Sequence, residues 1–138
     1  MRNTILFLVT VALLCSCSSK ENHGGVVFNP DSGNIQVVLL HLDQRCNSCK
    51  SIEDETIAVM EEYFNDLLVS GELTFVALPV TSEQGKSAAK LLNASGLLFA
   101  VVKGEERIDL TSPAFMYAHA DPERFRVELK EAIDKLIP

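Results

Sequence analysis

Two cysteines separated by two residues are the part of this 138-residue chain whose types and spacing favour chemistry. The segment Cys46-Asn47-Ser48-Cys49 would hold both sulfurs within one turn of a helix. A thiolate at Cys46 can attack a disulfide to form a mixed disulfide, which Cys49 then resolves by attacking Cys46. The pair could instead form a structural disulfide, but so small a loop gains limited stability from closure. It could also bind a metal ion, although structural zinc requires four ligands and the pair supplies only part of such a set.

A helix that begins at this pair would activate the first thiol. The free N–H groups and the positive end of the helix macrodipole stabilise a thiolate at a helix N-terminus. Arg45 and Lys50 flank the pair and would add to this stabilisation if their charges face the sulfurs. We therefore predict Cys46 as the nucleophile and Cys49 as the resolving thiol. Arg45 and Lys50 are predicted to tune the thiolate, and no resident metal or cofactor is predicted.

The residues around the pair predict the elements that must position it. Residues 35–42 form a nearly continuous apolar run, which is typical of a strand covered on both faces at the centre of an α/β sheet. From residue 51 the apolar residues follow a helical period up to Ser70-Gly71, where glycine suits a C-cap. The remaining segments predict a strand over 73–80, a helix over 83–93, a strand over 97–102, a hairpin strand over 107–110, and a last helix from Asp121 and Pro122. This order predicts a mixed sheet with helices on both faces.

The first strand, the Cys-x-x-Cys at a helix start and this order of elements resemble the thioredoxin-like fold over residues 35–137. The resemblance implies an α/β fold of thioredoxin-like type, a three-layer α/β/α sandwich with a mixed central sheet. It also implies thiol–disulfide exchange with a disulfide-containing protein or with the partner of a redox relay. The sequence leaves open whether this exchange makes the chain an enzyme, a thiol-disulfide oxidoreductase.

The chain departs from the thioredoxin pattern at several positions. It has no tryptophan, and Arg45 stands where the family has one before the first cysteine. Asn47-Ser48 replace the family's Gly-Pro, and Leu40 occupies the position of its buried carboxylate. Residues 93–97 contain no proline where the family has its cis-proline. These departures leave electron transfer possible. They also make metal binding by the dithiol more feasible, because the family's cis-proline helps to keep metal ions off the two thiols.

The segment from Cys46 to Glu53 is also similar to the Cys-x-x-Cys region of small heavy-metal-associated domains, which bind copper(I) between two soft thiolates. The alternative function is therefore a non-catalytic binding module that uses the same dithiol for a metal (copper or zinc) or for a protein partner. His41 is close in sequence, but alternation in the strand favours a core position for it over metal ligation. We expect the acidic residues between 53 and 62 to form a solvated helix face, and His119 to be solvated in a loop.

The N-terminal residues predict an export signal and a lipid anchor. Residues 5–14 are almost wholly apolar after a single positive charge, which is typical of a secretory signal and too short to span a bilayer. Leu14-Cys15-Ser16-Cys17 resembles a bacterial lipobox, in which the last cysteine is acylated and becomes the first residue of the mature protein. The resemblance implies a signal peptide over residues 1–16, a lipidated tether and linker over 17–34, and a thioredoxin-like domain over 35–138. Cys17 would carry the lipid (palmitate), and Ser18-Ser19 imply sorting to the bacterial outer membrane, on its periplasmic or its surface face.

Composition and charge exclude several classes of protein. The chain is 47% apolar and 22% charged, as in a globular domain. A formal net charge of −7 argues against nucleic-acid binding, which needs a basic surface. The sequence contains no second long apolar run, so a polytopic membrane protein is excluded and the lipid is the predicted membrane attachment. The predicted compartment is oxidising, so the cysteine pair can rest there as a disulfide.

Overall fold

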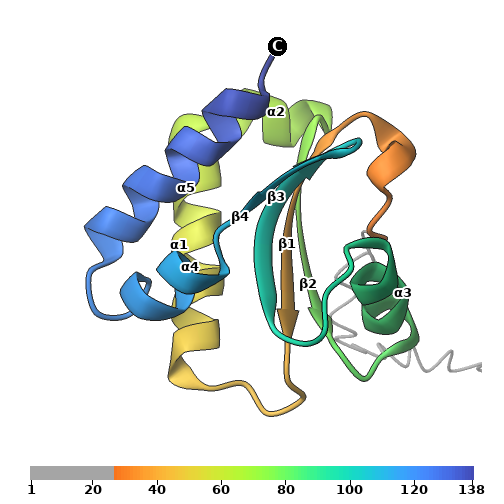
Figure 1. Cartoon of the computed structure of the whole chain (residues 1–138). Coiled ribbons are helices and arrows are strands. Elements are labelled where there is room, and N and C mark those ends of the chain that lie inside the picture. Colours follow the sequence, from red (N-terminus) through yellow and green to blue (C-terminus); the bar gives the residue numbers. More distant parts are fainter. Residues whose placement is uncertain (1–26) are drawn as a thin grey trace, which may run out of the picture.

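The predicted buried strand lies at the centre of the sheet in the computed structural model, which describes residues 27–138 (Figure 1). β1 (Ile35–His41) is buried at all seven positions. It pairs in parallel with β2 (Leu73–Pro79) on one side and antiparallel with β3 (Leu98–Lys103) on the other. β4 (Glu106–Asp109) pairs antiparallel with β3, which gives the strand order β2-β1-β3-β4. Because both faces of β1 are covered, its sequence is a continuous apolar run rather than an alternating one.

Helices cover both faces of this mixed sheet (Figure 1). One face carries α1 (Asn47–Tyr63), α2 (Asn65–Ser70), α4 (Thr111–Tyr117) and α5 (Pro122–Leu136), and the other carries α3 (Glu83–Leu91). Each face has its own apolar core. In the larger core, the ring centroids of Phe99 and Phe125 are 5.6 Å apart. The predicted thioredoxin-like three-layer α/β/α sandwich with a mixed central sheet is confirmed.

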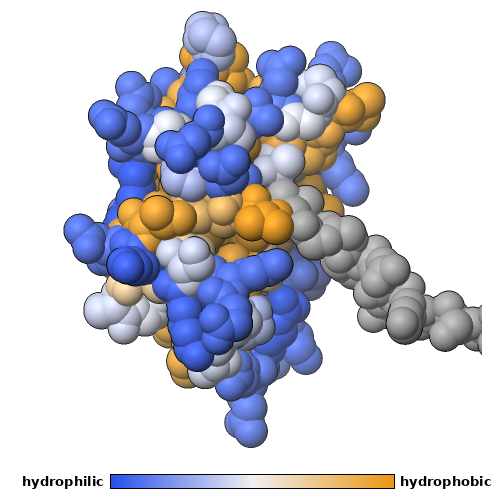
Figure 2. Space-filling view, turned by 90° about the vertical axis from the view of Figure 1, so that its right-hand side faces the viewer, coloured by the Kyte–Doolittle hydropathy of each residue, from blue (hydrophilic) through white to orange (hydrophobic). Residues whose placement is uncertain are grey.

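The α3 face is covered by one short helix and by the chain that precedes β1. Phe28 is buried in the core on this face, and the Asn29 N–H donates to Oε1 of the buried Gln36 at 2.9 Å. Gly85 lets α3 approach the end of β2 so closely that a Cβ there would lie 1.9 Å from the Pro79 carbonyl oxygen. Seen from this side, an apolar band crosses the surface between hydrophilic regions (Figure 2). The packing of this face thus depends on close backbone contacts as well as on side chains.

Two helices differ from the sequence prediction. The helix predicted to begin at the cysteine pair and to end near Ser70 does begin there, at Asn47, but it is interrupted at Phe64. The backbone of Phe64 leaves the helical region (φ −132°, ψ 25°), and its ring is buried in the larger core. The sequence prediction did not include α4. Its buried residue, Ala114, and its buried C-cap residue, Ala118, are small, so the helical period of this segment is weak.

The described residues begin at Val27, so the predicted signal peptide, Cys17 and the first part of the predicted linker lie outside them. The described part of that linker contains a short 3-10 helix, η1 (Pro30–Ser32), which the Asn29 side chain caps. None of the helices within residues 27–138 has the length and apolar character needed to cross a membrane.

Candidate functional site

Cys46 lies at the N-cap of α1, just after the loop that follows β1. Its backbone is extended (φ −78°, ψ 167°), and the residue is exposed to solvent. The first N–H groups of a helix have no partner inside the helix, and they face the capping residue. The Cys46 side chain makes no capping hydrogen bond, but the backbone of this helix start contributes to the lowered pKa of its thiol. The cysteine pair therefore lies where a helix start stabilises negative charge on the first thiol.

The two thiols differ in exposure and in acidity. Their Sγ atoms are 3.2 Å apart, and Cys49 is only 3% exposed. The pKa of Cys46 is below its ordinary value, chiefly because the Cys49 thiol donates a hydrogen bond to its sulfur. The pKa of Cys49 is above its ordinary value, chiefly because burial disfavours its thiolate and also because it is the donor in that hydrogen bond. The arrangement presents one accessible thiol with a lowered pKa and one buried thiol.

The described residues supply few ligands for a metal ion at this pair. Structural zinc requires four ligands. Within residues 27–138, no three side chains of histidine, cysteine, aspartate or glutamate gather so that they could hold a metal ion. The described part of the chain therefore supplies the two thiols alone for the metal alternative.

Arg45, the residue before the nucleophile, contacts two side chains other than the thiols. Its guanidinium forms an ion pair with Glu53 through Nη1 and lies 3.3 Å from Nε2 of His41 through Nη2. His41 is buried at the end of β1, as the sequence predicted, with Nδ1 2.7 Å from the Leu42 carbonyl oxygen. Burial raises the pKa of Cys49, and the charge of Arg45 opposes this rise. The structure thus holds Arg45, one of the two residues predicted to tune the thiolate, by contacts with Glu53 and His41.

The acidic face of α1 is only partly solvated. Glu53 pairs with Arg45, and Glu55 accepts from Nε of Arg126 at 2.5 Å. The side chains of Glu53 and Glu55 are 23% and 19% exposed. The prediction of a fully solvated acidic face was wrong for these two residues, because the loop before α1 and helix α5 bring arginines to them.

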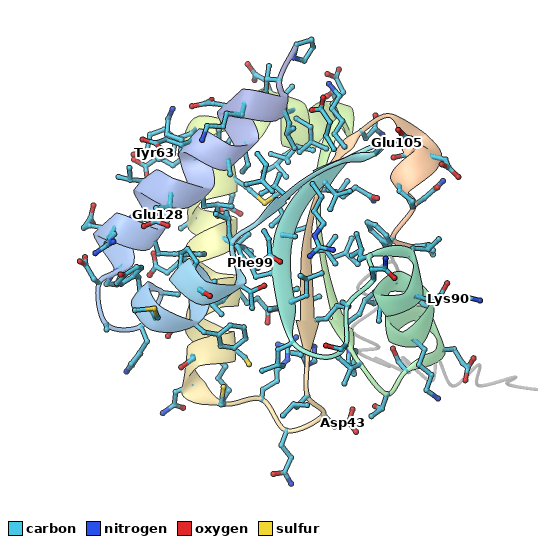
Figure 3. The ribbon with its side chains drawn as sticks, viewed as in Figure 1. Asp43, Tyr63, Lys90, Phe99, Glu105 and Glu128 are labelled. Carbon is cyan, nitrogen blue, oxygen red and sulfur yellow. The ribbon has the colours of Figure 1, made fainter. Side chains whose placement is uncertain are left out.

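Other residues near the pair have separate contacts. Lys50 is exposed, and its side chain makes no hydrogen bond or ion pair with any residue that the structure describes. Asp43, in the loop between β1 and α1 (Figure 3), accepts a hydrogen bond from the Thr81 hydroxyl. His119 is exposed, with Nδ1 3.1 Å from the Ser51 hydroxyl, which links the α4–α5 loop to α1. The loop before Cys46 is therefore held by contacts of Asp43 and Arg45, whereas Lys50 has no partner among the described residues.

Two departures from the thioredoxin pattern have structural consequences. Leu40 is fully buried in the core on the α3 side of the sheet, so no carboxylate lies at that position. The described residues contain no cis peptide bond, and Asn93, in the segment before β3, adopts a left-handed conformation (φ 49°). β1 therefore offers no carboxylate that could accept the proton of Cys49.

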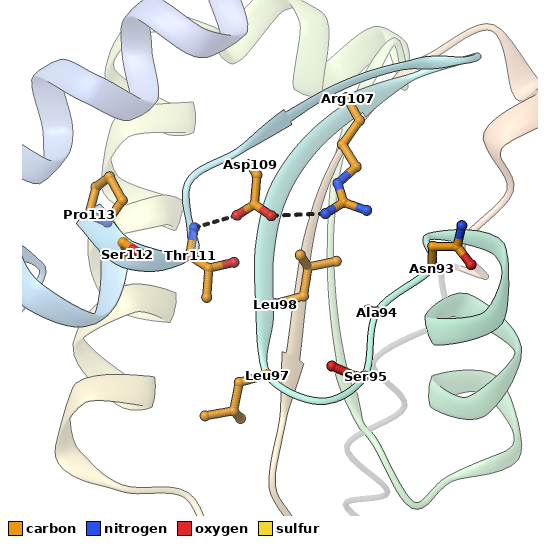
Figure 4. A pocket seen from close by; sticks show the side chains of 10 residues that line it. All are labelled: Asn93, Ala94, Ser95, Leu97, Leu98, Arg107, Asp109, Thr111, Ser112 and Pro113. Carbon is orange, nitrogen blue, oxygen red and sulfur yellow. Dashed lines mark hydrogen bonds and ion pairs between the residues drawn. The ribbon is translucent and has the colours of Figure 1, made fainter.

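A polar cavity of about 430 Å³ lies beside β4 and the start of α4 (Figure 4). Arg107 donates to the Asp109 carboxylate at 2.8 Å and to the Leu92 carbonyl oxygen, and Asp109 accepts the Thr111 N–H at 2.9 Å. Neither cysteine nor histidine is among the described residues that line it. Sequence reasoning predicted no cavity here and named part of its lining, residues 93–97, only as the segment without the family's cis-proline.

Sequence reasoning also did not connect Arg45 with Glu53 and His41. Arg45 lies in a loop and Glu53 lies on α1, so neither the helical nor the strand period relates the two residues. The loop between β1 and α1 brings them together, so the only signal in the sequence was their opposite charge.

No family model matches this chain, and no curated protein sequence matches it. The chemistry of the site is therefore argued from its own geometry.

Proposed function

We propose that the protein carries out thiol–disulfide exchange through the Cys46–Cys49 dithiol. The observation that carries the proposal is the exposed Cys46 sulfur at the N-cap of α1, 3.2 Å from the buried Cys49 sulfur. The hydrogen bond from Cys49 lowers the pKa of Cys46 and so increases its fraction of thiolate, the form that attacks disulfides. Burial raises the pKa of Cys49, which keeps the resolving thiol protonated until exchange begins.

In the proposed reaction, the Cys46 thiolate attacks one sulfur of a substrate disulfide. A disulfide between Cys46 and the substrate forms, the substrate S–S bond breaks, and the other substrate sulfur leaves as a thiolate that takes up a proton. Cys49 then loses its proton to solvent and attacks the Cys46 sulfur. The Cys46–Cys49 disulfide forms and the second substrate thiolate is released. The dithiol has lost two electrons and the substrate disulfide has gained two, so a partner dithiol must reduce the pair for another cycle.

We also propose that a lipid on Cys17 attaches the protein to a bacterial outer membrane. The support is the lipobox-like segment Leu14-Cys15-Ser16-Cys17 and the polar residues that follow it. The residues between Cys17 and the first described residue, Val27, can span at most about 30 Å. Bacteria fed a labelled palmitate analogue should label the wild-type chain and the matched Cys15→Ser control. Label that persists in Cys17→Ser would contradict the assignment.

A redox titration tests the exchange function. The full-length chain with Cys15→Ser and Cys17→Ser, termed here the two-cysteine chain, keeps only Cys46 and Cys49. It would be solubilised in detergent, equilibrated in metal-free thiol/disulfide buffers, alkylated and weighed as an intact protein. We expect a reversible two-electron transition whose midpoint falls within the range of these buffers.

Two other outcomes would contradict this function. A pair that stays oxidised in the most reducing buffer would identify a structural disulfide. A pair that never oxidises, but is shielded from alkylation once copper(I) or zinc is added, would favour the alternative of a non-catalytic binding module.

A further inference from the structure

The ion pair between Arg45 and Glu53 lies next to the thiols and takes no part in the exchange steps. Both partners are partly shielded from solvent, with side chains that are 35% and 23% exposed. Glu53 lies on α1, the helix that holds Cys49, and Arg45 directly precedes the N-cap residue of that helix. The ion pair therefore links the loop before the nucleophile to the body of the helix.

His41 fixes the other edge of the guanidinium. Its Nδ1 is 2.7 Å from the Leu42 carbonyl oxygen, so Nδ1 carries the hydrogen and donates it. Nε2 then has a lone pair, which accepts a hydrogen bond from Nη2 of Arg45 at 3.3 Å. A ring that donates on one side and accepts on the other is neutral. Glu53 is therefore the residue in this network that neutralises the charge of Arg45.

The charge of Arg45 acts on the buried thiol of the pair. Burial raises the pKa of Cys49, and the Arg45 guanidinium opposes that rise. A cation that stabilises a thiolate stabilises the reduced form of a dithiol and makes its disulfide more oxidising. A carboxylate that neutralises and holds this cation has the opposite effect.

We propose that Glu53 is a positioning residue that holds the Arg45 guanidinium against His41 and thereby sets the reduction potential of the Cys46–Cys49 pair. This inference deepens the proposed function and rests on it, because a pair that exchanges no electrons has no potential to set. Glu53 acts through Arg45 rather than through contact with the reacting sulfurs.

The test compares Glu53→Gln with Asp54→Asn in the two-cysteine chain. Both variants remove one negative charge from α1, but Asp54 is exposed and pairs with no cation among the described residues. Each variant is equilibrated with a dithiol of known potential, and the oxidised fraction is measured by alkylation and intact mass. We expect Glu53→Gln to favour reduction by about tenfold, which is about 30 mV for a two-electron couple. We expect Asp54→Asn to change the same equilibrium by less than about twofold.

Arg45→Gln provides a second test with the opposite sign. It removes the cation and leaves Glu53 negative near the pair, so the same equilibrium should shift toward the disulfide. In an Arg45→Gln background, Glu53→Gln should shift the equilibrium no more than Asp54→Asn does, because the guanidinium through which Glu53 acts is absent. A circular-dichroism spectrum of each variant checks that it is folded. If Glu53→Gln fails to fold, Glu53→Ala, which removes the same charge, takes its place in both comparisons.

Equal shifts for Glu53→Gln and Asp54→Asn would overturn the inference. A Glu53→Gln shift that persists without Arg45 would overturn it as well, and so would an Arg45→Gln shift toward reduction. In each of these cases a reversible midpoint in the parent chain leaves the exchange function standing. A parent chain without a reversible midpoint would overturn the exchange function itself.

Discussion

Two arginine–carboxylate pairs of similar chemistry lie in different surroundings in this molecule. Arg45 pairs with Glu53 at the start of α1, and Arg107 pairs with Asp109 at 2.8 Å in the wall of the polar cavity. Each arginine also contacts a neutral acceptor. The first pair lies beside an exposed thiol with a lowered pKa, whereas no cysteine or histidine is among the described residues that line the cavity (Figure 4).

This comparison indicates that neither an ion pair nor a cavity accounts for the lowered pKa of the Cys46 thiol. Cys46 becomes nucleophilic because a thiol donor and the backbone N–H groups of a helix start stabilise its thiolate. The Asp109 carboxylate instead accepts the Thr111 N–H at the start of α4 and pairs with Arg107 of its own strand. We infer that the thiol end of the molecule carries the chemistry and that the cavity wall supports the fold.

The largest effect on the rate of disulfide exchange is expected from a substitution at the thiol pair that leaves the cavity unchanged. Cys46→Ser in the two-cysteine chain should reduce the rate of reaction with a small aromatic disulfide to the rate without protein, because the nucleophile is lost. Cys49→Ser should still react once and stop as a mixed disulfide that is detectable by intact mass. Ser112→Ala, a matched loss of a hydroxyl in the cavity, should leave the rate unchanged within about twofold. Exchange that survives in Cys46→Ser, or is lost in Ser112→Ala, would contradict the inference that the thiol pair carries the chemistry.

A smaller effect should follow from removing the hydrogen-bond donor to the nucleophile. The Cys49 thiol is the main cause of the lowered pKa of Cys46, so Cys49→Ala should raise that pKa and reduce the thiolate fraction at neutral pH. We expect iodoacetamide to alkylate Cys46 about tenfold more slowly at about pH 7, the effect of one charge-assisted hydrogen bond. Ser48→Ala is the control, because it removes a hydroxyl from the first turn of α1 and leaves the Cys49 thiol in place. Equal rates for Cys49→Ala and the parent chain would show that the Cys49 thiol does not stabilise the thiolate.

The fold could be predicted from the sequence where the local pattern is strong. The apolar run of residues 35–42 required a strand covered on both faces, and Asp121 and Pro122 marked the start of α5. α4 was missed because its buried residues are alanines, which give a weak period. Its start was nevertheless marked in the sequence, since an aspartate such as Asp109 favours a turn in which it accepts the N–H two residues on, here that of Thr111.

The candidate site could be predicted only as far as it is local. Cys-x-x-Cys at the start of a helix is a contact within one turn, and the structure has it there. The contact between Arg45 and Glu53 depends on the path of a loop, for which the sequence holds no period. The raised pKa of Cys49 depends chiefly on burial, which is set by packing between segments that are distant in sequence.

A further prediction tests the cavity wall through its pH dependence. Partial burial raises the pKa of Asp109, but hydrogen bonds from Thr111 and the charge of Arg107 outweigh burial and hold the pKa below its ordinary value. A carboxyl with a lowered pKa in the folded state adds stability above its unfolded pKa, and that stability is lost as the pH falls below about 4. Asp109→Asn should cost about 1 kcal/mol or less at neutral pH, because the side chain is 49% exposed and solvent screens its ion pair.

The measurement for this prediction is urea unfolding at about pH 7 and about pH 3. The parent chain should lose more stability between these values than Asp109→Asn, which has no carboxylate there to protonate. Asp134→Asn, which removes an aspartate from an exposed pair with Lys130 on α5, is the matched control and should keep the parent's pH dependence. Identical losses for the parent chain and Asp109→Asn would contradict a lowered pKa for Asp109.

The smallest effect, on the alkylation rate of Cys46, is expected from Lys50. This prediction compares Lys50, which has no described partner, with Arg45, which is held by two contacts. Lys50 follows Cys49 directly, but its exposed side chain has no hydrogen-bond or ion-pair partner among the described residues, whereas Arg45 is held on two edges. An exposed charge is screened within about 3 Å at 1 M salt. Lys50→Gln should therefore slow alkylation of Cys46 by less than about twofold in dilute buffer and not at all in about 1 M salt. A slowing as large as that of Cys49→Ala, or one that persists in high salt, would mean that Lys50 reaches the thiolate in solution and that sequence adjacency is enough to tune this pair.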